Sequence, residues 1–250
     1  MSAPAFSIVI PCYNEAENLP LLLAAYRAAW PQFEAELILV DNGSTDNSAA
    51  VMERELRRPE FAFARSVRVE RNRGYGFGVH AGLRAARGEI IGISHADMQC
   101  DPRDLFTAYA LLKRQPDPRR AMVKGKRARR GLGPSLITST MAVIATVVLL
   151  TPLADINAQP KVFHRDLLRL MTEAPDGFEL DLYALYTARR NGLRVLTIPV
   201  IFGQRAHGVS KWAFSLISRW RHIWATVRYI FRLRFAGPAR HGTRTACESD

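Results

Sequence analysis

Apolar segments alternate with helix-like segments through the first hundred residues, and this alternation most constrains the fold. Residues 6–12 and 89–94 are apolar runs bounded by turn residues, and residues 37–40 and 67–70 form two shorter runs. The intervening segments carry apolar residues at helical spacing or a glycine-rich turn that leads into a helix. Strands that alternate with helices form a parallel sheet with right-handed crossovers. The sequence therefore predicts an α/β fold with a mostly parallel central sheet and flanking helices.

Polar residues follow three of the four predicted strands, as Tyr13-Asn14-Glu15, Asp41-Asn42 and Asp97-Met98-Gln99. Ligands bind at the carboxyl ends of the strands in such sheets, so we expect these residues to share one crevice. A carboxylate fixed at a strand end can bind a divalent cation that bridges the phosphates of a nucleoside diphosphate. The alternative is that Asp97 caps a turn and Asp41 only begins a loop. The convergence of several polar strand ends favours the ligand site.

These motifs, in this order and spacing, resemble the family 2 glycosyltransferases, whose fold is the Rossmann-like GT-A fold. The matching segments are Pro11-Cys12-Tyr13-Asn14-Glu15, Asp41-Asn42-Gly43-Ser44-Thr45-Asp46 and Asp97-Met98-Gln99. The segment from Arg205 to Lys211 resembles the R-x-x-G-x-S-K motif of the branch that contains dolichyl-phosphate mannose synthases and polyprenyl-phosphate glycosyltransferases. The resemblance spans roughly residues 6–235. It implies an inverting transferase that moves a hexose from a donor such as GDP-mannose or UDP-glucose to a polyprenyl or dolichyl phosphate.

The resemblance also implies a donor site and a metal, Mg²⁺ or Mn²⁺. The implied donor-binding residues are Pro11, Tyr13, Glu15, Asp41, Gly74, His95, Asp97 and Gln99, of which Asp97 and Gln99 match the metal-binding positions. His95 stands where the family usually has its first aspartate. A neutral imidazole can bind Mn²⁺ but is a poor ligand for Mg²⁺. The alternative for His95 is a hydrogen-bonding residue at the strand end.

On the acceptor side, the resemblance implies that Arg127, Arg205 and Lys211 hold a phosphate and that Asp97 and Asp181 complete the catalytic set. Arginine suits two-pronged contact with an oxyanion, whereas lysine acts as a point charge. Asp181 can be a general base, a sugar ligand or a favourable charge near a helix N-terminus, and Glu179 competes for these roles. The residues Asp155, Asn157, Gln159 and Lys161 are assigned to the wall of the site without a particular step. A mobile basic surface loop is the alternative for residues 124–130.

Charge and two apolar segments point to a membrane surface. The net charge of +12 and the pI near 10.2 favour an anionic partner. Residues 132–154 carry no charge and are long enough to cross a bilayer, but they contain polar residues and prolines, and a span would divide the site. We therefore expect a helix that is buried or lies in the membrane interface. Residues 212–235 predict a helix whose apolar face suits a lipid surface, with Arg221, Arg228 and Arg232 beside it; the face comprises Leu216, Trp220, Ile223, Trp224, Val227, Ile230 and Phe231.

The predicted organisation is a catalytic domain over residues 1–211, a basic amphipathic helix over 212–236 and a flexible tail over 237–250. We expect peripheral association with the cytoplasmic face of a membrane. Three cysteines without metal-binding spacing and the lack of a secretory signal fit a reducing compartment. Three alternatives remain: transfer to a glycan or lipid-linked sugar hydroxyl, a catalytically impaired nucleotide-sugar-binding protein, and a nucleic-acid-binding protein. Nucleic acid is not the expected partner, because the sequence has no RNP signature, zinc spacing or helix-turn-helix pattern.

Overall fold

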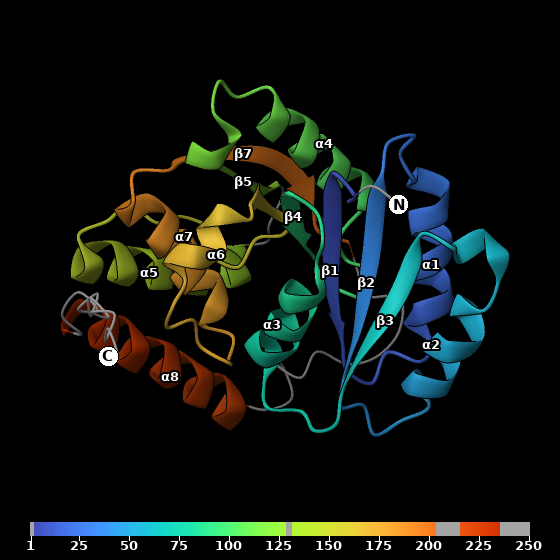
Figure 1. Ribbon diagram of the computed structural model, residues 1–250. Coiled ribbons are helices and arrows are strands. Elements are labelled where there is room, and N and C mark those ends of the chain that lie inside the picture. The colour runs from blue at the N-terminus through green and yellow to red at the C-terminus, as the bar shows by residue number, and fades with distance from the viewer. Residues whose placement is uncertain (1–2, 129–131, 204–215, 236–250) are drawn as a thin grey trace, which may run out of the picture.

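The computed structural model describes residues 3–128, 132–203 and 216–235. Within them a seven-stranded sheet has the order β3-β2-β1-β4-β6-β5-β7 (Figure 1). The strands are β1 (Phe6–Cys12), β2 (Ala35–Asn42), β3 (Ala64–Val69), β4 (Ile90–Ile93), β5 (Ala121–Ala128), β6 (Lys161–His164) and β7 (Arg194–Ile201). Of the strands in these ranges, β6 runs antiparallel to its neighbours β4 and β5, and the remaining pairs are parallel. The predicted mostly parallel α/β sheet is confirmed.

Helices cover both faces of this sheet. They are α1 (Asn18–Ala29), α2 (Ser48–Leu56), α3 (Tyr75–Ala85), α4 (Pro102–Lys113), α5 (Leu132–Leu149), α6 (Asp166–Leu170), α7 (Leu180–Arg190) and α8 (Leu216–Phe235), with short 3₁₀ turns at Pro59–Phe61 and Pro118–Arg120. Successive residues of a strand point to opposite faces, so Ile8 and Ile10 pack with α1, α2 and α4, while Val9 packs with α3, α6 and α7. A third cluster joins α5, α7 and α8.

The strands predicted in the first hundred residues all form, as β1, β2, β3 and β4. The sequence analysis did not predict β5 or β6, because the segments around Lys124 and Lys161 look polar. Both lysines are buried inside the sheet. Cys12 and Cys100 are free thiols, as expected, and Cys247 lies outside the described residues.

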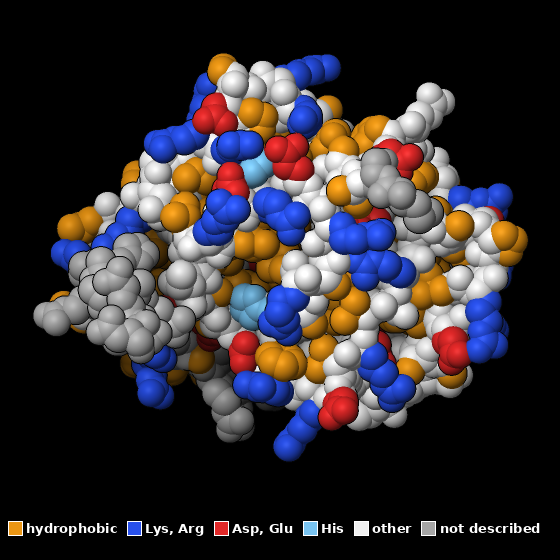
Figure 2. Space-filling view, in the orientation of Figure 1, with side chains coloured by type: hydrophobic (Ala, Val, Ile, Leu, Met, Phe, Trp, Pro, Cys, Tyr) orange, Lys and Arg blue, Asp and Glu red, His pale blue; other side chains and the backbone are white. Residues whose placement is uncertain are grey.

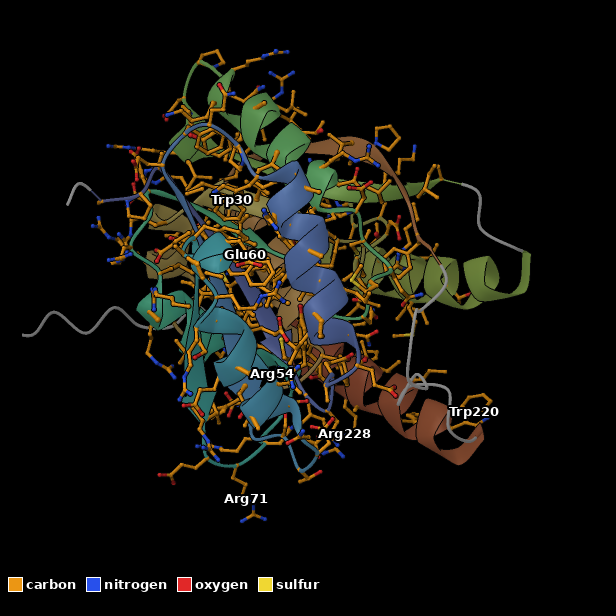
Figure 3. All side chains as sticks on the ribbon, turned by 90° about the vertical axis from the view of Figure 1, so that its right-hand side faces the viewer. Trp30, Arg54, Glu60, Arg71, Trp220 and Arg228 are labelled. Carbon is orange, nitrogen blue, oxygen red and sulfur yellow. The ribbon has the colours of Figure 1, made fainter. Side chains whose placement is uncertain are left out.

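Helix α8 divides its apolar residues between two sides. Ile230 is buried in the cluster with α5 and α7, so the prediction that it belongs to a lipid-facing surface was wrong. Trp220 and Trp224 are 60% and 62% exposed, and Phe231 and Phe235 are also exposed. Figure 3 shows Trp220 at one end of α8, away from the body of the molecule. We call Trp220, Trp224, Phe231 and Phe235 the aromatic stripe; they recur at helical spacing on the side of α8 opposite the packed one.

Among the helices in the described part of the chain, none combines the length and the hydrophobicity needed to cross a bilayer. Basic side chains are spread over much of the surface seen in Figure 2, in keeping with the high net charge.

Candidate active site

The turns after β1 and β2 are joined by reciprocal hydrogen bonds. Asn14 donates through Nδ2 to Thr45 Oγ1 at 3.1 Å, and its Oδ1 accepts from the Thr45 backbone N–H at 2.8 Å. The Asn14 backbone N–H also donates to Ser44 Oγ at 3.2 Å. Asn14 has a φ of 57°, a conformation that asparagine tolerates better than most residues. These contacts fix the polar turn that carries Tyr13 and Glu15 against the turn that follows Asp41.

Asp41 and Asn42 end β2, beside the end of β1. Asp41 is the register partner of Cys12, is buried, and accepts a hydrogen bond from the Ser44 backbone N–H at 3.0 Å. Asn42 Nδ2 donates to the Gly74 carbonyl at 2.9 Å, which connects β2 to the start of α3. The two turns thus form one wall at the carboxyl edge of the sheet, where the predicted donor-binding residues Pro11, Tyr13, Glu15 and Asp41 lie together.

The glycine-rich turn before α3 serves close packing. An ideal Cβ at Gly74 would lie 2.3 Å from the Asp176 carbonyl oxygen, and one at Gly76 would lie 2.3 Å from the Pro175 carbonyl oxygen. Gly74 also has a φ of 127°, which side-chain-bearing residues rarely adopt. The Asp176 carbonyl in turn accepts from the Phe77 backbone N–H at 3.0 Å. These glycines therefore allow the segment before α7 to lie on the N-terminus of α3.

Asp97 lies in the turn after β4, two strands away from Asp41 on the same edge. It is buried, and its Oδ1 accepts from the Gln99 backbone N–H at 3.2 Å. Met98, between them, has a φ of 61°, so the turn holds a backbone conformation that is unfavourable for its residue type. Two hydrogen bonds join Gln99 to Gly203. The Gln99 side-chain Nε2 donates to the Gly203 carbonyl at 3.0 Å, and the Gln99 backbone carbonyl accepts from the Gly203 backbone N–H at 2.9 Å.

His95 lies between the Asp97 turn and an aromatic wall. Its ring centre is 5.8 Å from that of Tyr75, which stacks on Phe178 at 5.6 Å. Burial lowers the pKa of His95, while the negative charges of Asp97 and Asp181 act in the opposite direction. The net lowering favours a neutral imidazole near pH 7. Such a ring can accept or donate a hydrogen bond, or bind a metal through one nitrogen.

Asp181 is held by a buried lysine, Lys161, which the sequence analysis assigned to the wall of the site without a particular step. Lys161 Nζ lies 2.8 Å from Asp181 Oδ1, and Gln159 Nε2 donates to the two carboxylate oxygens at 3.2 and 3.4 Å. The Lys161 side chain is fully buried, and burial lowers its pKa although Asp181 opposes the change. The segment that contains Asp155, Gln159 and Lys161 was assigned to the site wall, and the structure shows two of its polar residues binding Asp181.

Arg127 ends β5 close to the same site. Its backbone N–H donates to Asp155 Oδ2 at 2.7 Å, and its Nη2 donates to the Asn157 carbonyl at 2.6 Å. The guanidinium carbon lies 4.6 Å from the centre of the Phe202 ring. These contacts hold the Arg127 guanidinium in place, and its positive charge lowers the pKa of His95. Arg205 and Lys211, the other two predicted phosphate-binding residues, lie outside the described residues.

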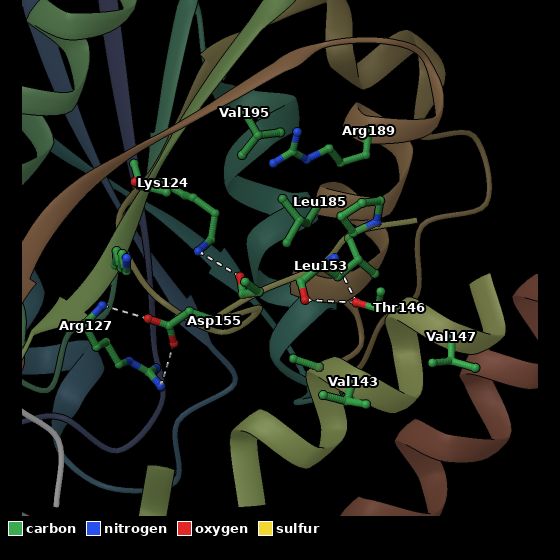
Figure 4. A pocket seen from close by; sticks show the side chains of 15 residues that line it. Lys124, Arg127, Val143, Thr146, Val147, Leu153, Asp155, Leu185, Arg189 and Val195 are labelled. Atoms are coloured by element: carbon green, nitrogen blue, oxygen red, sulfur yellow. Dashed lines mark hydrogen bonds and ion pairs between the residues drawn. The ribbon is translucent and has the colours of Figure 1, made fainter. Parts of the chain in front are cut away.

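A cavity of 810 Å³ opens beside Arg127, between β5, α5 and α7. Its basic residues are Lys124, Lys126, Arg127 and Arg189, and its apolar lining comprises Ala142, Val143, Val147, Pro152, Leu153, Ala154, Leu185 and Val195. Figure 4 shows Lys124 and Arg127 on the β5 side, with Val143 and Val147 on α5 and Leu185 and Arg189 on α7. Such a cavity suits a molecule with an anionic head and a hydrocarbon body.

The Asp97 turn fits a divalent metal that is shared with a phosphate ligand. The buried Asp97 carboxylate lies close enough to the His95 imidazole to influence its pKa, and Gln99 follows Asp97 by two residues. In the described residues, no group of three or more His, Cys, Asp or Glu side chains could hold a metal ion. Mg²⁺ in nucleotide sites is commonly held by one or two carboxylates together with substrate phosphates. The donor set here matches that arrangement rather than an all-protein cage.

Comparison with protein families and curated sequences gives a consistent result. The model for glycosyl transferase family 2 matches residues 7–168. An uncharacterized glycosyltransferase of Mycobacterium tuberculosis is 34% identical over 222 residues, which cover 86% of this chain and 93% of the relative. An undecaprenyl-phosphate 4-deoxy-4-formamido-L-arabinose transferase of Photorhabdus laumondii is 29% identical over 83% of this chain; the match covers 63% of that enzyme.

Solved structures show the same fold. Glucosyl-3-phosphoglycerate synthase from Mycobacterium tuberculosis, in complex with Mn²⁺, UDP and glucosyl-3-phosphoglycerate, has a TM-score of 0.71 and 19% identity, over 95% of this chain and 82% of that one. A mannosyltransferase from Pyrobaculum calidifontis, in complex with GDP-Man and Mn²⁺, has a TM-score of 0.65 and 21% identity, over 94% and 71% of the two chains. At these identities the likeness establishes the fold.

Proposed function

Because this chain belongs to glycosyl transferase family 2, and is therefore a glycosyltransferase, we propose that it moves a hexose from a nucleotide-diphosphate sugar to a polyprenyl phosphate with inversion. The observation that carries this proposal is the cavity beside Arg127, which joins a basic end to an apolar lining. The similarity to undecaprenyl-phosphate transferases supports the same acceptor class. The proposed donor is of the GDP-mannose or UDP-glucose type, and its proposed site is the wall formed by the turns after β1 and β2.

In this proposal the nucleotide is bound at the carboxyl edge of β1 and β2. Pro11, Tyr13, Glu15 and Asp41 hold the base and ribose, and the glycine-rich turn at Gly74 shapes the neighbouring wall. Asp97, with Gln99 and His95 beside it, would hold a divalent ion, Mg²⁺ or Mn²⁺. That ion, when bound, neutralises charge on the leaving diphosphate.

The chemistry proposed is a direct displacement at the anomeric carbon. An oxygen of the acceptor phosphate forms the new bond to that carbon, while the nucleoside diphosphate leaves with the electron pair of the broken C–O bond. Arg127, together with Arg205 and Lys211, orients the acceptor phosphate. The phosphate oxygen is already anionic near neutral pH, so the step needs no general base.

The surroundings of Asp181 favour a phosphate acceptor over a hydroxyl acceptor. A hydroxyl requires a base with an accessible oxygen, but both Asp181 oxygens accept hydrogen bonds from Gln159 and one also pairs with Lys161. In place of a general base, a role that the sequence analysis considered, we infer that Asp181 anchors this side of the site through Lys161.

A transfer assay tests the acceptor class. Purified protein is incubated with radiolabelled GDP-mannose or UDP-glucose, Mn²⁺ or Mg²⁺, and polyprenyl phosphate. We expect label in a lipid fraction that mild acid releases, as a glycosyl phosphodiester should. Label that enters only a glycan would identify the hydroxyl-acceptor alternative. Failure to transfer or hydrolyse any donor would favour the catalytically impaired alternative.

We further propose peripheral binding to the cytoplasmic face of a membrane, where such an acceptor is embedded. The aromatic stripe of α8 is accompanied by exposed arginines at 228 and 232, a combination that suits an anionic interface. Val143 and Val147 on α5 and Leu150 directly after it are exposed, so the cavity lies beside further apolar surface.

Replacing Trp220 and Trp224 together by serine is expected to weaken binding to anionic vesicles by about tenfold or more, because two large apolar side chains no longer enter the interface. Vesicle sedimentation measures the effect. Leu21→Ser, which changes an exposed leucine on α1, provides the control and should bind like the wild type. Equal binding by all three proteins would contradict the membrane role of the aromatic stripe.

A further inference from the structure

One buried charge in the cavity has no role in the proposed reaction. Lys124, in β5, is 2% exposed and is the cross-strand neighbour of Lys161 in β6. Register partners project from the same face of a sheet, so two lysines lie side by side in the interior. Like charges in this arrangement repel each other, and burial of each ammonium group is unfavourable unless an anion compensates it.

The two lysines differ in the groups that compensate their positive charges. Lys161 has the Asp181 carboxylate at 2.8 Å. Lys124 Nζ donates to two backbone carbonyls, of Gly125 at 2.9 Å and of Ala154 at 3.1 Å. Across the described ranges no carboxylate is within ion-pair distance of Lys124. Burial lowers the pKa of Lys124 to about 8, and the positive charge of Lys161 acts in the same direction.

The cavity that Lys124 lines has room for an anion that would compensate the charge of this lysine. Lys126, Arg127 and Arg189 line the same cavity, where the acidic lining residue is Asp155. Asp155 is already bound by the backbone N–H of Arg127 and lies 3.8 Å from its guanidinium. The cavity therefore holds more positive than negative charge, and an incoming anion would supply the counter-charge that Lys124 lacks.

We propose that Lys124 binds the acceptor phosphate in this cavity and makes the site prefer the dianionic phosphate monoester to the monoanionic diester product. This inference rests on the proposed function. A phosphate monoester carries roughly −1.5 to −2 charges at pH 7. Bond formation to the sugar converts it to a diester with a single negative charge. Because Lys124 otherwise contacts only neutral carbonyls, it gains most from the doubly charged form, and the product leaves more readily than the acceptor.

Equilibrium binding without donor tests this preference. The probes are farnesyl phosphate, its monomethyl ester as a mimic of the diester product, and farnesol. We expect wild-type protein to bind the monoester more tightly than the methyl ester, and Lys124→Met to reduce that ratio by about tenfold. Lys113→Met, at an exposed lysine on α4, is the control and should keep the wild-type ratio. If the methionine variant does not fold, Lys124→Gln is tested for the same change.

The outcomes separate the inference from the function on which it rests. An unchanged ratio in a folded Lys124 variant, or equal binding of the two esters by the wild type, overturns the role of Lys124 and leaves the proposed acceptor class standing. Tighter binding of farnesol than of either ester, with label transferred only to a glycan, overturns the acceptor class as well.

Discussion

Replacing Asp97 by alanine is expected to lower kcat for sugar transfer by about a hundred- to a thousandfold while the protein remains folded. The carboxylate would hold the divalent ion that stabilises the leaving diphosphate, and loss of one preorganised group that stabilises developing charge has effects of this size. Asp97 is buried, and its Oδ1 accepts a hydrogen bond from the Gln99 backbone N–H, two residues further on. The measurement is steady-state turnover across a series of Mn²⁺ concentrations, with a thermal unfolding curve for each variant.

Asp101→Asn provides the matched control for Asp97. Asp101 lies four residues further along and caps α4 through the Arg103 backbone N–H at 2.9 Å. Asparagine keeps the capping oxygen, so helix stability should change little. We expect near-wild-type turnover from this variant. Wild-type turnover by a folded Asp97→Ala protein would show that the Asp97 turn does not hold the metal, and the assignment of Gln99 and His95 beside it would fail too.

Replacing Asp181 by alanine is expected to destabilise the fold by about 3–5 kcal/mol, because it leaves the Lys161 ammonium buried without its partner. Urea unfolding measures the change. The double variant Asp181→Leu with Lys161→Met should recover most of the loss, since it removes both charges and replaces them with apolar side chains.

Glu53 on α2 and Arg57, the residue that caps the end of α2, form an exposed ion pair that serves as the reference for stability. Both side chains are largely exposed, and Glu53→Ala should cost less than about 1 kcal/mol. If Asp181→Ala were as mild as Glu53→Ala, the buried pair would contribute nothing beyond a surface pair, and our account of Asp181 as an anchor would be wrong. Activity of the double variant then reports separately whether the charges themselves matter for transfer.

The sequence predicted the N-terminal half of the sheet well because β1, β2 and β4 are buried on both faces. Strands such as β1 and β4 then appear as continuous apolar runs, and a parallel arrangement brings their polar ends to one edge. That reasoning placed Asp41 and Asp97 on the same edge before any contact was known. It could not reveal that Gly74 and Gly76 serve packing against Pro175 and Asp176, because the partners are about a hundred residues away.

The part of the sheet formed by β5 and β6 was harder to predict because it buries charge. Lys124 and Lys161 broke the apolar pattern, so neither β5 nor β6 was predicted, although each lysine occupies a strand position. Their burial depends on tertiary neighbours, Asp181 for Lys161 and the carbonyl of Ala154 for Lys124. Asp181 was correctly placed near the start of a helix, but nothing in its local sequence identifies its partner. The individual roles assigned to site residues stay predictions.

The reversed direction of β6 makes the segment between β5 and β6 a separate excursion from the sheet. Because β6 is antiparallel to β5, the connection that contains α5 leaves the sheet and returns to it at the same edge, the carboxyl edge of β1, β2 and β4. An insertion or exchange within that excursion keeps the strand order and the turns after β1 and β2. Evolution could therefore alter the α5 side of the cavity beside Arg127 by replacing one segment, and chimaeras that exchange this segment between relatives offer a practical route to a changed cavity.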